Sequence, residues 1–114
     1  MEISIIELQG VKVVSIDGEL DGASAPQAQG KILPLASPEK ALVIDMSKVG
    51  FMSSAGLRMF LNLYRSISGH GGKVILVGLS EYLVDTMSLT GFLDFFEHYA
   101  TLDEGLAAIS GSGR

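Results

Sequence analysis

Two short runs of apolar residues constrain the fold of this chain most strongly, because neither alternates with polar residues. The runs are Ala-Leu-Val-Ile-Asp at 41–45 and Lys-Val-Ile-Leu-Val-Gly at 73–78. A half-buried strand alternates apolar and polar side chains, whereas a strand covered on both faces is apolar throughout. Each run is therefore predicted to be a buried strand of a largely parallel sheet with helices packed against it.

The segments around these runs alternate between strand-like and helix-like patterns. Two β-rich runs at the N-terminus are separated by Gln9-Gly10, which predicts an antiparallel hairpin. After the first buried run, apolar residues recur at helical spacing, at Leu57, Phe60, Leu61, Tyr64 and Ile67. The whole pattern predicts the order β-β-α-β-α-β-α-β-α, which is a single α/β domain with a mixed, mostly parallel sheet, an N-terminal hairpin and about four helices.

Local signals predict where the helices begin and end. Three residues are expected to cap helices, the first and last of them in capping boxes with a Gln or Glu three residues later: Ser24, Ser80 and Thr101. Pro34 is expected to end or kink the first helix, because proline disfavours helical geometry in the residue before it. The last helix is expected to reach about Ile109, so the domain is assigned to residues 1–110 and residues 111–114 to a flexible tail.

Composition excludes several classes of function. The formal net charge is −5 and no basic cluster stands out, which argues against nucleic-acid binding and against an anionic membrane surface. The chain has no cysteine, so disulfides and thiolate metal sites are excluded. Its N-terminus does not resemble a signal peptide, and no apolar stretch approaches the roughly 20 residues that span a bilayer. We therefore expect a cytoplasmic protein without direct membrane insertion.

The segment Val-Gly-Phe-Met-Ser-Ser-Ala-Gly-Leu-Arg, residues 49–58, contains two serines before a predicted helix. A nucleophilic serine needs a base, but His70 is expected at the far end of that helix, about 20 Å away. Nothing in the sequence places His98 near Ser54, and the Gly-x-Ser-x-Gly spacing of the nucleophile elbow is absent. Two isolated histidines also do not form a metal-ligand pattern. The sequence therefore predicts neither an enzyme nor a bound cofactor or metal.

A second interpretation is that one of the serines accepts a phosphate. A helix N-terminus exposes unpaired N–H groups and carries a partial positive charge, and this first turn has no acidic residue. A phosphate on Ser54 would lie beside those groups and within reach of Arg58, while Gly56 would allow another backbone to approach closely. The simplest interpretation of the residues alone remains an ordinary helix cap, with Arg58 in solvent.

Three stretches of the chain resemble the STAS domain family, in particular bacterial anti-sigma factor antagonists. They are GELDGASAP at 18–26, LVIDMSKVGFMSSAGLR at 42–58, and GGKVILVGLSEYLVDTMSLTGFLDFF at 71–96. The resemblance covers nearly the whole chain, and the order of the predicted elements agrees with the family's fold. It implies a domain that acts by binding other proteins.

The resemblance implies a phosphorylation switch. In such a switch the unphosphorylated domain binds an anti-sigma factor that is also a serine kinase, and this binding releases the kinase's captured target. The kinase then phosphorylates a serine at the start of the second helix, and a metal-dependent, PP2C-type serine phosphatase removes the phosphate. The alternative is a non-switching STAS subunit of a membrane lipid-transport complex. The oligomeric state is left open between a monomer and a weak homodimer.

The resemblance also suggests which serine is modified. Ser54 matches the serine of the family's Asp-Ser-Ala-Gly version and is the expected acceptor, with Ser53 as the second choice. Ser53 stands where many members have an acidic residue. Ala55 stands where members with Asp-Ser-Ser-Gly can carry their acceptor. Asp21 belongs to the matching Gly-Glu-Leu-Asp segment, so we expect it near the same helix end.

The remaining expectations concern contacts with the partner. Asp21 either faces the partner or is a loop carboxylate that caps the first helix. The other expected partner contacts lie in and after the serine pair: Ser53, Gly56, Arg58, Met59 and Leu63. Met59 and Leu63 lie beside the predicted apolar stripe, so they could equally contact the core.

Overall fold

The computed structural model describes residues 1–36 and 41–112, which form a five-stranded sheet and four α-helices. The strands are β1 (Glu2–Leu8), β2 (Val11–Asp17), β3 (Ala41–Lys48), β4 (Lys73–Val77) and β5 (Glu97–Tyr99). The helices are α1 (Ala25–Ile32), α2 (Ser54–Gly69), α3 (Glu81–Leu89) and α4 (Leu102–Ser112), with short 3₁₀ turns η1 (Leu33–Leu35) and η2 (Phe92–Phe95). The predicted order of strands and helices is confirmed.

The strands lie across the sheet in the same order as in the chain, from β1 to β5. β1 and β2 are antiparallel, and every other neighbouring pair is parallel. The β1–β2 turn has positive φ at both central residues, 55° at Gln9 and 76° at Gly10. This geometry fits a two-residue hairpin, because its twist matches that of the strands it joins. The predicted hairpin and mostly parallel sheet are both confirmed.

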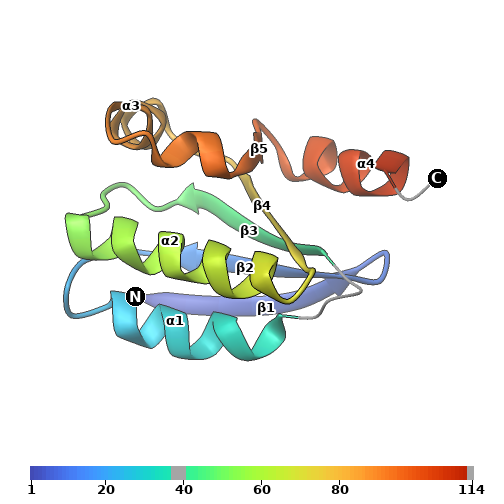
Figure 1. Cartoon of the computed structure of the whole chain (residues 1–114), viewed down its shortest axis with the longest axis horizontal. Coiled ribbons are helices and arrows are strands. Elements are labelled where there is room, and N and C mark those ends of the chain that lie inside the picture. Colours follow the sequence, from blue (N-terminus) through green and yellow to red (C-terminus); the bar gives the residue numbers. More distant parts are fainter. Residues whose placement is uncertain (37–40, 113–114) are drawn as a thin grey trace.

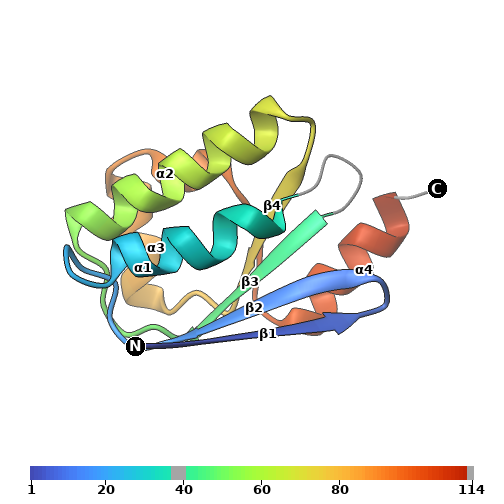
Figure 2. The ribbon, with the colours of Figure 1, turned by 90° about the horizontal axis from the view of Figure 1, so that it is seen from below.

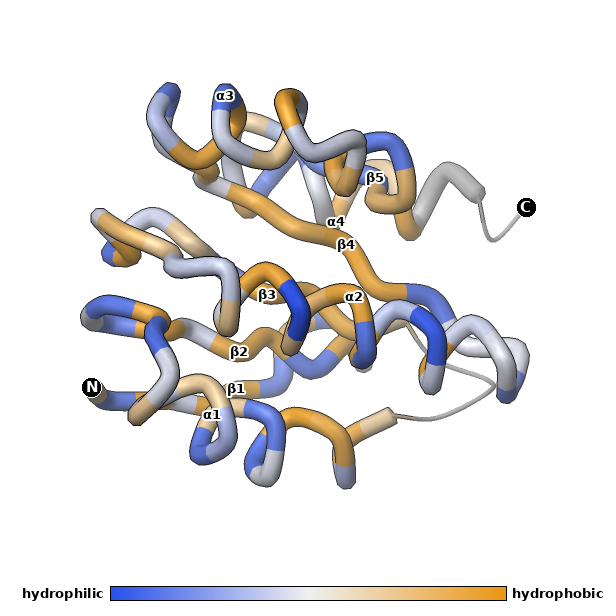
Figure 3. Tube along the Cα trace, turned by 60° about the vertical axis from the view of Figure 1, so that its left-hand side comes forward, coloured by the Kyte–Doolittle hydropathy of each residue, from blue (hydrophilic) through white to orange (hydrophobic). Residues whose placement is uncertain are grey.

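Helices cover the two faces of the sheet unequally. α1, α2 and α3 pack on one face and α4 packs on the other (Figures 1 and 2). In β3, Leu42 and Ile44 point to the three-helix side, while Val43 points to the α4 side. Figure 3 shows β4 as a nearly continuous apolar segment in the middle of the fold. Burial on both faces is the reason why these two strands lack polar alternation.

Two of the three predicted caps are present. Ser80 accepts a hydrogen bond from the N–H of Leu83 at 3.2 Å, and Thr101 accepts one from the N–H of Glu104 at 3.2 Å. The capping box predicted at Ser24 is wrong. Ser24 already has helical φ and ψ angles, and its hydroxyl donates to the carbonyl of Glu19 at 2.7 Å instead of capping α1.

The first helix ends where the sequence predicts, and the last helix is longer than predicted. α1 ends at Ile32, and the 3₁₀ turn η1 contains Pro34, as the proline predicts. α4 instead continues to Ser112, beyond the expected end at Ile109, so residues 111 and 112 of the expected tail are helical. An established helix extends at little cost, because each added residue gains a hydrogen bond. Residues 113 and 114 lie outside the described part of the chain.

Candidate functional site

Two segments that are distant in sequence lie side by side at the start of α2. Leu20 and Met52 form an isolated parallel bridge. The N–H of Leu20 donates to the carbonyl of Phe51 at 3.0 Å, and the N–H of Ser53 donates to the carbonyl of Leu20 at 2.8 Å. The structure therefore brings Asp21, which follows Leu20, to the helix end that carries the serines, as expected.

Gly56 makes this close approach possible. A Cβ atom at position 56 would lie 2.7 Å from Cγ of Met52 and 2.9 Å from the carbonyl oxygen of Leu20. The backbone that approaches Gly56 thus belongs to its own chain, and Gly56 is buried beneath the 18–22 segment. The expectation that Gly56 contacts a partner directly is corrected: a glycine is needed here for packing within the domain.

The adjacent serines have different environments. Ser53 is the N-cap of α2, and its hydroxyl accepts a hydrogen bond from the N–H of Gly56 at 3.4 Å. Ser54 is the first helical residue, its side chain is exposed, and its hydroxyl has no hydrogen-bond partner in residues 1–36 and 41–112. Within the same described residues, the N–H groups of Ser54 and Ala55 also lack an acceptor, as the first N–H groups of a helix usually do. The cap and the free hydroxyl are therefore on different serines.

Asp21 is held as a loop carboxylate before α1. Its Oδ1 accepts hydrogen bonds from the N–H groups of Ser24 and Ala23, both at 3.0 Å, and from the hydroxyl of Ser24 at 3.2 Å. These bonds, with those from the Ser24 and Ala23 backbone foremost, hold the pKa of Asp21 below its ordinary value. Asp21 is thus a fixed negative charge beside the serine pair.

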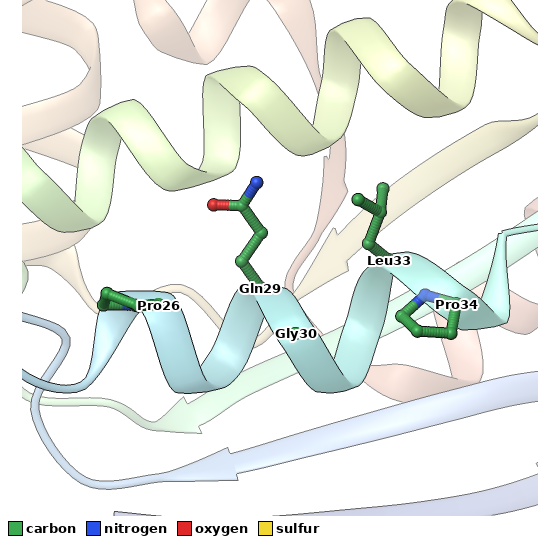
Figure 4. Close-up of a pocket in the computed structure, with 5 residues that line it drawn as sticks. All are labelled: Pro26, Gln29, Gly30, Leu33 and Pro34. Carbon is green, nitrogen blue, oxygen red and sulfur yellow. The ribbon is translucent and has the colours of Figure 1, made fainter.

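Arg58 lies one turn into α2 and is exposed. Across the described residues its guanidinium forms no ion pair or hydrogen bond. It borders a shallow groove of about 200 Å³ between α1 and α2, together with Gly22, Ala25, Pro26, Gln29, Ala55, Met59 and Asn62. A larger hollow of about 450 Å³ continues along α1, where Gln29 and Leu33 point towards α2 (Figure 4).

Met59 and Leu63 are not available as a docking surface. Their exposed fractions are 3% and 0%, and both belong to the core between α2 and the sheet. The predicted apolar stripe is displaced, because Leu61 and Tyr64 are only half-buried. Helical spacing is also followed by a second set of positions, which are buried: 56, 59, 60, 63 and 67. The packing of α1 and the sheet against α2 decides which of these two arcs is buried.

A pair of exposed aromatic residues next to the serines was not predicted. Phe51 precedes the bridge residue Met52, and Tyr82 lies in the first turn of α3. Their rings are stacked with centroids 6.2 Å apart and planes at 25°, although 40% and 48% of these residues are exposed. The only signal in the sequence was an aromatic residue in a loop, which gives no indication of its partner.

Among the described residues, neither histidine contacts the serine pair. His70 is the C-cap of α2, at the opposite end of a 16-residue helix from Ser54, and its Nδ1 lies 2.7 Å from the carbonyl oxygen of Ser66. His98 is in β5. Within the part of the chain that the structure describes, no three His, Cys, Asp or Glu side chains gather as metal ligands would. No helix of that part is long and apolar enough to cross a membrane.

Known proteins with similar sequences indicate the family of this chain. The family model for the STAS domain matches residues 2–105. The anti-sigma-B factor antagonist of Bacillus subtilis is 34% identical over 93 residues, which cover 82% of this chain and 85% of that protein. The anti-sigma-F factor antagonist RsfB of Mycobacterium tuberculosis is 30% identical over 112 residues, which cover 96% and 89%.

A solved structure extends the similarity to three dimensions. The crystal structure of an anti-sigma factor antagonist from Mycobacterium paratuberculosis aligns with a TM-score of 0.81 at 34% identity, and the alignment covers 96% of this chain and 93% of that one. By its sequence and its fold, this chain belongs to the STAS domain family.

Proposed function

We propose that this protein is an anti-sigma factor antagonist, that it binds an anti-sigma factor through the surface around the start of α2, and that phosphorylation of Ser54 prevents this binding. The observation that carries the proposal is that the two serines have different environments. Ser53 caps the helix, whereas Ser54 exposes a hydroxyl that no described residue uses. Similarity to proteins named as anti-sigma factor antagonists supports a regulatory binding function and not an enzymatic one.

A phosphate on Ser54 is compatible with the folded domain. It would add about −1.5 to −2 charge at the positive end of the helix dipole. The N–H groups of Ser54 and Ala55 would lie close to it, and their hydrogen-bonding capacity is unused by the described residues. The modified domain therefore stays folded, and the phosphate acts on the interface instead.

The effect on the interface follows from charge and hydration. A dianion that meets an acidic group of the partner, or loses its water without new hydrogen bonds, costs several kcal/mol of binding. A loss of about 4 kcal/mol is roughly a thousandfold in affinity. This is sufficient for a switch that needs no large conformational change.

The proposed interface combines charged and aromatic groups. Asp21 and Arg58 flank the serines on one side, and Phe51 with Tyr82 flank them on the other. Exposed aromatic residues near the centre of a contact surface commonly carry much of its binding energy. The proposed partners are an anti-sigma factor with serine-kinase activity and a PP2C-type phosphatase that restores the free hydroxyl; ATP and metal ions belong to these partners.

The proposal is tested with an anti-sigma factor kinase from the same organism. The purified protein, its Ser54→Ala variant and its Ser53→Ala variant are each incubated with the kinase and ATP, and modified residues are mapped by mass spectrometry. We expect phosphate on Ser54 in the wild type and in Ser53→Ala, and none in Ser54→Ala. Absence of phosphate on Ser54, with a kinase active on another substrate, would contradict the proposal.

Binding to the same kinase supplies the second measurement. Ser54→Ala is expected to bind within about twofold of the wild type, because it removes a hydroxyl and adds no charge. Ser54→Asp is expected to bind at least about tenfold more weakly, because it places a negative charge where the phosphate would be. Equal binding of Ser54→Asp and Ser54→Ala would argue against an electrostatic switch at this position.

A further inference from the structure

We propose that Arg58 is the group through which the switch acts: it binds a carboxylate of the partner while Ser54 is unmodified, and it pairs with the phosphate once Ser54 is phosphorylated. This inference rests on the proposed function. It adds the chemistry of the partner, whose segment opposite the α1–α2 groove is acidic. It also adds a mechanism, in which the phosphate competes with that segment for one cation.

The first support is the position of Arg58 relative to Ser54. The residues are four apart on α2 and both are exposed. Side chains at this spacing lie on the same face of a helix, with Cβ atoms about 5–6 Å apart. The guanidinium therefore reaches a phosphate on Ser54 without any movement of the backbone.

The second support is that Arg58 has no acceptor within the described residues. Lys73, by comparison, pairs with Glu97 at 3.1 Å. Asp21, the acid that follows Leu20 in the neighbouring loop, accepts the N–H groups of Ala23 and Ser24 at its Oδ1. No described contact joins Asp21 to Arg58. Among the described residues, the cation is thus unpaired.

The third support is the composition of the groove beside it. Among the described residues that line the groove, Arg58 alone is charged, and Gln29 and Asn62 add side-chain amides. Gln29 points from α1 towards α2 (Figure 4). A planar guanidinium with amide donors nearby fits a carboxylate, because its parallel N–H groups match the two oxygens.

Phosphorylation replaces the partner's carboxylate with the phosphate on Ser54 as the anion that pairs with Arg58. The phosphate carries about twice the charge of a carboxylate and offers three acceptor oxygens. It is also attached to the same helix, so pairing costs no association entropy. Its negative charge, next to that of Asp21, additionally repels the acidic segment of the partner.

Intrachain pairing is tested without any partner. Phosphoserine is incorporated genetically at position 54, and its second ionisation is followed by ³¹P NMR in the wild type, Arg58→Gln, Arg58→Lys and Arg65→Gln. Arg65 is the control, because it is an exposed arginine of α2 two turns further along. We expect a phosphate pKa that is lower in the wild type and in Arg65→Gln than in Arg58→Gln, by about 0.3 pH unit or more, with Arg58→Lys in between. Equal values in all four proteins would overturn the proposal.

Partner binding is tested with the kinase that phosphorylates Ser54. We expect Arg58→Gln to weaken binding of the unphosphorylated protein about tenfold. We also expect phosphorylation to reduce the affinity of Arg58→Gln by a smaller factor than that of the wild type, with Arg65→Gln like the wild type. If Arg58→Gln binds and switches like the wild type, Arg58 is not the group that switches, and the proposed function still stands. A wild-type protein that is not phosphorylated on Ser54 would instead refute the proposed function.

Discussion

At the start of α2, two neighbouring serines illustrate how position in a helix decides what a side chain does. The extended backbone of Ser53 (φ −81°, ψ 175°) directs its hydroxyl to the N–H of Gly56. Ser54 is one residue further along and already helical, and its exposed hydroxyl makes no hydrogen bond with the described residues. The same residue type thus caps the helix at one position and is left exposed at the next.

This difference predicts unequal effects of alanine on stability. Ser53→Ala is expected to lower the free energy of unfolding by about 1 kcal/mol, because it leaves the N–H of Gly56 without its cap. Ser54→Ala should change it by less than about 0.5 kcal/mol, as is usual for exposed positions. Urea denaturation measures both. A loss in Ser54→Ala as large as that in Ser53→Ala would show that both hydroxyls stabilise the helix.

The carboxylate of Asp21 predicts a pH dependence of stability. Its pKa is lowered from the ordinary 3.8 by hydrogen bonds from the N–H groups of Ser24 and Ala23. A lowered pKa means that the ionised form stabilises the fold. The contribution is fully present above the unfolded-state value and is lost as the pH falls through the folded-state value.

Asp21→Asn separates charge from hydrogen bonding, because the amide oxygen can still accept both N–H groups. We expect the wild type to be more stable than Asp21→Asn at pH 6–7 and the difference to shrink as the pH falls below about 4. Thermal unfolding at a series of pH values measures this. A difference that stays constant down to pH 2.5 would mean that the charge of Asp21 does not contribute.

Gly56 predicts a steric effect. In Gly56→Ala the new Cβ would lie 2.9 Å from the Leu20 carbonyl oxygen and 2.7 Å from Met52, so we expect a loss of about 1–3 kcal/mol of stability. Gly30→Ala is the matched control. It also places alanine within a helix but meets no atom within 4 Å, so it should stabilise the protein by about 0.5–1 kcal/mol. Denaturant unfolding of the two variants should therefore give changes of opposite sign.

At the scale of elements, the parallel arrangement of β3 and β4 places the starts of α2 and α3 at the same edge of the sheet. This is why Phe51, in the loop before α2, stacks on Tyr82 in the first turn of α3. A surface made from two helix starts combines loop backbone, free N–H groups and side chains from separate parts of the sequence. Ligand-binding regions of α/β sheets are commonly found at this edge.

The aromatic pair predicts a loss of binding without a loss of folding. Phe51→Ala and Tyr82→Ala are each expected to weaken binding to the anti-sigma factor about tenfold, as for aromatic residues at the centre of an interface. Leu89→Ala is the control, because Leu89 is 89% exposed at the other end of α3. Calorimetric titration measures the affinity, and circular dichroism checks folding. Wild-type affinity in both aromatic variants would place the interface elsewhere.

At the scale of the whole molecule, we expect the core to be unaffected by a negative charge added at position 54. The side chain is exposed, and the buried residues of α2 begin at Gly56. In Ser54→Asp, amide chemical-shift changes in a ¹H–¹⁵N spectrum are expected to be confined to the start of α2, residues 18–24 and the first turn of α3. Changes that spread to α4, on the opposite face of the sheet, would contradict a local switch.

Local sequence patterns predicted the elements well, and the failures have identifiable causes. The buried strands, the hairpin turn at Gln9-Gly10 and the cap at Ser80 depend on short-range chemistry, and all are present. Ser24 failed as a cap because Asp21 and Glu19, from the preceding loop, take up its hydrogen bonds. The prediction of the apolar stripe on α2 was wrong in part, because helical periodicity is compatible with more than one apolar arc on this helix.

The sequence by itself determined the order of strands and helices, the two buried strands and the position of the serine pair at a helix start, because hydrophobic period, turn residues and caps act over a few neighbouring residues. The tertiary structure alone decided that Gly56 packs under Leu20, that Met59 and Leu63 are buried, and that Phe51 meets Tyr82. It also decided that Ser53 is the cap and Ser54 the free hydroxyl. These outcomes depend on contacts between residues far apart in the chain and on the exact angle at which the helix begins, which no local pattern encodes.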